Sequence, residues 1–106
     1  MKILFDQGTP VPLRTHLPNH VVETAYEKGW SNLRNGDLLT QAEAKGFEAL
    51  VTTDQNLRHQ QNLSGRRIGV VVLLTTSWPR IEKNTALVIQ AIDNLRPGRY
   101  EEVRFP

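Results

Sequence analysis

The chain of 106 residues has the length of one domain, and its hydrophobic fraction of 39% is enough for a single core. Its formal net charge is +2, a balance so common in small domains that it does not by itself indicate a nucleic-acid partner. There is no cysteine, which excludes disulfides and cysteine-bound zinc and fits a reducing cytoplasm. No apolar stretch approaches the roughly 18 residues of a membrane span, so we expect a cytoplasmic protein without a membrane partner.

Strand-forming and helix-forming segments alternate along the chain. Apolar and β-branched runs predict strands at residues 3–6, 21–26, 49–53, 68–74 and 100–105. Polar or amphipathic segments predict a short helix at 10–17, a helix at 37–45, a short helix or turn at 55–62 and the longest helix at 79–95. This alternation predicts an α/β protein: a single three-layer domain over residues 1–106, with a mainly parallel sheet and helices on both faces.

Two local patterns refine this prediction. Thr9 before Pro10 has the sequence of a helix N-cap followed by proline in the first turn. A strand order of 2-1-3-4 would place the first and third strands side by side. Ligands bind in open α/β sheets where the strand order reverses, which here is between the carboxyl ends of those two strands.

Three aspartates lie at strand ends or helix starts. Asp6 follows the first predicted strand, Asp54 follows the third, and Asp37 opens a predicted helix. Carboxylates gathered in one crevice would repel one another unless a divalent cation neutralised them. The pattern therefore indicates a Mg²⁺ or Mn²⁺ phosphodiesterase site. Asp37 and Asp54 have an alternative role in stabilising a helix start, whereas Asp6 has none if Thr9 supplies the cap.

These residues carry a resemblance to a known family. Segments 1–6 (MKILFD), 36–39 (GDLL) and 50–54 (LVTTD) resemble the signature of PIN-like nucleases. The nearest match is a small bacterial branch of uncharacterised PIN-like proteins, grouped as a domain of unknown function. That branch has an Asp after the first strand, an Asp-x-x-Ile-like helix start and a Val-Thr-x-Asp-x-Asp-Phe segment. The resemblance covers roughly residues 1–75.

The resemblance implies a function and a set of site residues. PIN domains are Mg²⁺- or Mn²⁺-dependent ribonucleases, many of them toxins of toxin–antitoxin pairs. It implies that Asp6, Asp37 and Asp54 ligate the metal ion, that RNA is the substrate, and that partners include an antitoxin-like protein or a second copy of the chain. The branch often has Asp at position 56, where this chain has Asn56. The resemblance implies that Asn56 acts in catalysis together with the three aspartates, although its amide adds no charge. Segment 7–10 (QGTP) replaces an Asn-Leu-Pro-like stretch.

Other interpretations stay open. A catalytically weak or inactive PIN-like module would bind RNA or a protein partner. A receiver-like or flavodoxin-like domain shares the strand order, but a receiver would want a second acid where Gln7 follows Asp6. A phosphate could be offset by Arg14, Arg34 or Arg58, among which the sequence does not choose.

Further polar residues have competing roles. The basic side chains of the second half could meet a phosphate-rich partner or form a solvated surface; they are Arg58, Arg66, Arg67, Arg80 and Lys83. The histidines do not form a spaced metal motif; they are His16, His20 and His59. Glu23 is a weaker candidate for a fourth acid, and Trp30 and Trp78 are expected to anchor the core.

Overall fold

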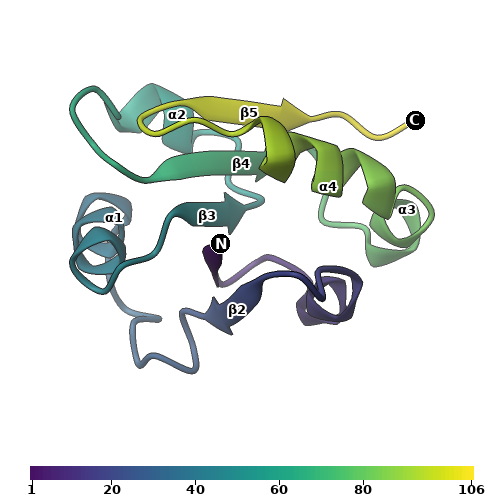
Figure 1. Ribbon diagram of the computed structural model, residues 1–106, viewed down its shortest axis with the longest axis horizontal. Coiled ribbons are helices and arrows are strands. Elements are labelled where there is room, and N and C mark those ends of the chain that lie inside the picture. The colour runs from purple at the N-terminus through teal and green to yellow at the C-terminus, as the bar shows by residue number, and fades with distance from the viewer.

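The computed structural model describes residues 1–106 as a layered α/β structure (Figure 1). The strands are β1 (Lys2–Phe5), β2 (Val21–Thr24), β3 (Ala49–Thr52), β4 (Gly69–Leu73) and β5 (Tyr100–Val103). The helices are the 3-10 helix η1 (Val11–His16), α1 (Asn35–Ala44), α2 (Leu57–Gln60), α3 (Trp78–Glu82) and α4 (Thr85–Asn94). All neighbouring strands pair in parallel, in the order β2-β1-β3-β4-β5. The predicted fold class and the predicted order of the first four strands are confirmed.

The sheet separates two hydrophobic cores. Because side chains alternate along a strand, Ile3 and Phe5 enter one core and Leu4 enters the other. The first core is covered by η1, α3 and α4, and the second by α1 and α2 (Figure 1). Every residue of β3 and β4 is buried, as expected for central strands covered on both faces. This explains the near-continuous apolar run at 68–74.

The predicted long helix at 79–95 is wrong in one respect, because the structure divides it into α3 and α4. The break is at Asn84, whose side-chain amide donates to the carbonyl of Arg80 at 2.9 Å. In a continuous helix that carbonyl would accept the backbone N–H of Asn84, which here bonds to Ile81 instead. Asparagine side chains compete with the helical backbone in this way, and here the competition ends α3.

The predicted N-cap at Thr9 is also wrong. The residue preceding η1 is Pro10, and no side chain caps this helix. The Thr9 hydroxyl is buried and donates to the carbonyl of Val51 at 2.8 Å. Thr9 therefore attaches the loop after β1 to β3, which fixes the backbone beside Asp6. None of the helices combines the length and the apolar character that crossing a membrane requires.

Candidate metal centre at the sheet switch point

Asp6 and Thr52 lie opposite each other where two central strands end. Strands β1 and β3 are adjacent and parallel, with Phe5 paired to Val51, so the next residues, Asp6 and Thr52, emerge together at the carboxyl edge. The backbone N–H of Asp6 extends this pairing by donating to Val51 O at 2.9 Å. The strand order reverses between β1 and β3, because β2 flanks β1 on the other side. Asp6 thus lies at the switch point, where open α/β sheets form the crevice that binds ligands.

A buried hydroxyl joins the two strand-end aspartates. Thr52 Oγ1 donates to Asp6 Oδ2 at 2.9 Å and accepts the backbone N–H of Asp54 at 3.0 Å. The other Asp6 oxygen accepts the N–H of Gln7 at 2.8 Å. The Thr52 side chain is fully buried, whereas both aspartates are partly exposed. The structure therefore brings Asp6 and Asp54 into one hydrogen-bonded unit that opens to solvent.

Asp54 also connects this unit to the start of α1. Its Oδ2 accepts the side-chain amide of Asn35 at 3.2 Å, and Asn35 is the first residue of α1. Asp37 lies in the same first turn and is exposed, and no hydrogen bond or ion pair joins it to Asp6 or Asp54. The helix begins two residues earlier than predicted, so Asn35 and not Asp37 makes the contact with Asp54.

Asn56 contacts Asp54 through its backbone and not through its side chain. Its N–H donates to Asp54 Oδ1 at 2.9 Å, a bond to a residue two positions back that closes a turn before α2. Its own side chain is exposed and makes no hydrogen bond within the chain. The structural alternative for Asp54, stabilising the segment that leads into α2, is thus realised together with its place at the strand end.

The charges of the two aspartates have no cationic partner in the protein. Every donor to their side chains is neutral, and neither takes part in an ion pair; the ion pairs present are Arg14–Glu27, Lys28–Glu23, Arg58–Glu102 and Arg66–Glu43. Each carboxylate oxygen accepts one hydrogen bond and keeps a second lone pair. No three Asp, Glu or His side chains are grouped as a metal-ligand set. Two carboxylates with free lone pairs nevertheless fit Mg²⁺, which is usually held by one or two carboxylates and retains several waters.

Asp6 also lines an open cleft of about 610 Å³. Arg14 also lines this cleft, and its guanidinium makes two hydrogen bonds to Glu27, at 2.8 and 3.2 Å. These bonds from Arg14 are the main reason why the pKa of Glu27 lies below its usual value. Tyr26 borders the same cleft and is 79% exposed. Of the arginines that the sequence left open as phosphate partners, Arg14 is the one beside Asp6.

The remaining candidates have structural roles. Glu23 pairs with Lys28 at 3.2 Å, and Trp30 packs edge-on against Phe47 in the second core. His16 packs against Trp78. The sequence did not indicate Thr52 and Asn35, which contact the candidate residues Asp6 and Asp54. A threonine at a strand end and an asparagine before a glycine carry no signal of such contacts, because both contacts depend on how distant segments pack.

The fold and this edge together define the class of protein: a parallel α/β protein in which aspartates follow two adjacent strands at the switch point of the sheet. No family model, curated protein or solved structure matches the chain.

Proposed function

We propose that this protein is a metal-dependent phosphodiesterase that cleaves RNA, with Asp6 and Asp54 as its central carboxylates. One observation carries the proposal. Two neighbouring aspartates at the switch point are oriented by four neutral donors, and no lysine or arginine balances their charge. Because no cationic side chain neutralises these carboxylates, both remain available to bind a hard cation. The resemblance of segments 1–6, 36–39 and 50–54 to PIN-like nucleases supports the same function and its toxin-type variant.

The chain's own residues would orient the ligands. Asp6 and Asp54 would hold Mg²⁺ or Mn²⁺, and Asp37 is proposed as the third carboxylate, from the helical turn that Asn35 attaches to Asp54. The Thr52 hydroxyl fixes one Asp6 oxygen, which limits the rotation of this carboxylate. When bound, the ion would lower the pKa of a coordinated water and provide a nucleophile at neutral pH.

The cleft beside Asp6 has the chemistry to receive a nucleotide. The side chains of Arg14 and Glu27 are 34% and 48% exposed, and ion pairs so open to solvent are weak, so a phosphate can compete for the guanidinium. The exposed ring of Tyr26 offers a face on which a base can stack. A single-stranded RNA that reaches Asp6 through this cleft would meet a positive charge and an aromatic surface.

Cleavage of single-stranded RNA with Mn²⁺ or Mg²⁺ tests the proposal. We expect Asp6→Asn and Asp54→Asn each to abolish cleavage, and Asp37→Asn to reduce it, in variants whose thermal unfolding shows that they are folded. Asp93→Asn is the matched control, because Asp93 is exposed on α4 in the other layer and makes no hydrogen bond. Calorimetry with Mn²⁺ should show binding that Asp6→Asn weakens. Cleavage that survives both Asp6→Asn and Asp54→Asn would overturn the proposal. RNA binding without any cleavage would instead indicate the non-catalytic module.

A further inference from the structure

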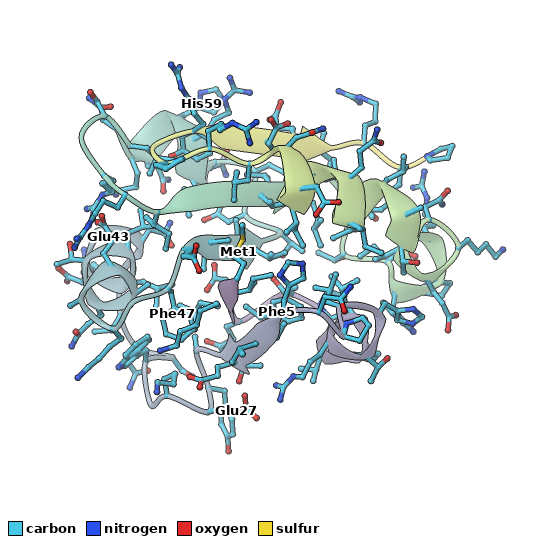
Figure 2. The ribbon with its side chains drawn as sticks, in the orientation of Figure 1. Met1, Phe5, Glu27, Glu43, Phe47 and His59 are labelled. Atoms are coloured by element: carbon cyan, nitrogen blue, oxygen red, sulfur yellow. The ribbon has the colours of Figure 1, made fainter.

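A second open cleft, of about 870 Å³, lies near the amino-terminal ends of β4 and β5. Its walls are residues 58–66, which follow β3 and precede β4, and residues 97–100, which lead into β5. We call it the basic cleft, because its lining includes Arg58, His59, Arg66 and Arg99 but no aspartate or glutamate. Figure 2 shows His59 projecting outward from α2. Arg58 and Arg66, two of the arginines that the sequence marked as candidates for a phosphate-rich partner, are thus joined by Arg99 from a distant segment.

The walls of the basic cleft are held together by backbone contacts. The N–H of Gly98 donates to Ile68 O at 3.0 Å, and Gly98 has a φ of +71°. A Cβ at this position would lie 3.1 Å from Leu63 O and 3.2 Å from Arg66 O, so only glycine lets the two walls approach so closely. The Tyr100 hydroxyl donates to Gln61 O at 2.8 Å. Burial raises the pKa of Tyr100, although the charges of Arg58 and Arg66 act in the opposite direction.

The positive charges differ in how far they are already neutralised. Arg66 bonds to Glu43 at 2.6 Å, and both side chains are largely buried, so this pair serves to position the wall. Arg58 pairs with Glu102 at 2.8 Å, but both side chains are more exposed, and such a pair is weak. The side chains of Arg99 and His59 make no hydrogen bond or ion pair within the chain. The basic cleft therefore presents free donors and an uncompensated positive charge.

We propose that the basic cleft binds a phosphate-bearing anion, with Arg99 as the main contact and Arg58 as a second contact once it leaves Glu102. A guanidinium donates two parallel hydrogen bonds to phosphate, and the absence of acids in the lining removes the repulsion that would oppose an anion. This site is separate from the aspartate pair, and it does not depend on the function proposed above. Its ligand is either a free phosphate group or the phosphates of a nucleic-acid chain.

Calorimetric titration of the full chain with inorganic phosphate, and separately with a hexauridylate oligonucleotide, tests the site and identifies the source. We expect saturable binding of at least one probe, and a loss of affinity of roughly tenfold in Arg99→Gln. Arg104→Gln is the matched control, because it removes the same charge from an exposed residue that lies outside the basic cleft. Binding of inorganic phosphate alone would identify a free anion as the ligand. Binding of the oligonucleotide alone would identify the phosphates of a nucleic-acid chain as the ligand. An oligonucleotide affinity that Arg99→Gln leaves unchanged would assign that probe to the cleft beside Asp6 and would count against this site.

A gain of affinity provides a second test that a folding defect could not imitate. Glu102→Gln frees Arg58 from its acidic partner, so it should tighten binding several-fold, by less than the roughly tenfold effect of a whole contact. Glu101→Gln removes the same charge from the adjacent position of β5, whose side chain points to the other face of the sheet, and should have little effect. The proposal is overturned if neither probe binds, if Arg104→Gln weakens binding as much as Arg99→Gln does, or if the two glutamate variants behave alike.

Discussion

The hydroxyl of Thr52 donates a hydrogen bond to Oδ2 of Asp6 at 2.9 Å, across a sequence separation of 46 residues. Oγ1 of Thr52 also accepts the backbone N–H of Asp54 at 3.0 Å, so one buried side chain connects the two aspartates. The arrangement follows from two parallel strands that end side by side. It also identifies Thr52 as the residue whose substitution should disturb the Asp6 carboxylate and the Asp54 backbone without changing the charge of the site.

Thr52→Val keeps the shape of the side chain and removes its hydroxyl. One donor to Asp6 and one acceptor for Asp54 are lost, so we expect the free energy of unfolding to fall by about 1–3 kcal/mol. The metal-dependent cleavage proposed above should fall as well, because the Asp6 side chain then keeps only the bond from the N–H of Gln7. Urea denaturation measures the first effect. Thr76→Val, at an exposed position without a hydrogen bond, should stay within about 0.5 kcal/mol of the wild type. Equal stability of the two variants would contradict the structural role of Thr52.

Asn56→Asp would place a further carboxylate beside Asp54. The Asn56 side chain is exposed and makes no bond, so the substitution should leave the fold intact. If a cation binds between the aspartates, the added charge should tighten Mn²⁺ binding roughly tenfold, about 1.4 kcal/mol, as measured by calorimetry. Asn94→Asp adds the same charge at the end of α4 and should not change the affinity. An unchanged affinity in Asn56→Asp would count against a metal ion at this position.

Gly69→Ala tests the packing beneath the start of β4. A Cβ on Gly69 would lie 2.6 Å from Leu95 Cγ and 2.9 Å from the backbone oxygen of Arg96, so the turn after α4 would have to move. We expect a loss of stability of about 1–3 kcal/mol in thermal or urea unfolding. Gly36→Ala is the matched control, because Gly36 is helical and its nearest neighbour is the flexible end of Gln61 at 3.2 Å. It should be neutral, or stabilising by up to about 1 kcal/mol.

Glu43 should make stability depend on pH in the acidic range. Burial alone would raise the pKa of Glu43, but the bonds and charges of Arg67 and Arg66 outweigh it and lower this pKa below its ordinary value of 4.5. The unfolded chain therefore binds the proton more readily. The stabilisation is fully present above the unfolded pKa and is lost as the pH falls through the lower pKa of the folded state.

Glu43→Gln should consequently destabilise the protein by about 1–3 kcal/mol at pH 7 and by clearly less at acidic pH. Urea denaturation at both pH values measures this difference. Glu82→Gln, at an exposed site without an ion pair, should show no such dependence. If the difference in unfolding free energy between wild type and Glu43→Gln is the same at both pH values, the lowered pKa of Glu43 is refuted.

The layered fold and the proximity of two candidate site residues could be predicted from the sequence. Buried parallel strands need apolar residues on both faces, so residues 68–74 indicated a central strand before any contact was known. Once the strand order was inferred, Asp6 and Asp54 were expected at neighbouring strand ends, and the structure joins them through Thr52. The division of the last helix could not be predicted, because it depends on a side-chain bond from Asn84 to Arg80 that competes closely with the helical one.

The amino-acid pattern by itself determined which segments are strands and helices, because periodic burial of apolar groups dominates the free energy of local structure. Only the tertiary structure decided that Asn35 contacts Asp54, that Thr9 attaches to β3 and that Arg99 joins Arg58 and Arg66 in the basic cleft. Each of these contacts joins polar groups from distant segments. A polar side chain finds its partner only after the chain has packed, so its place cannot be derived from local pattern.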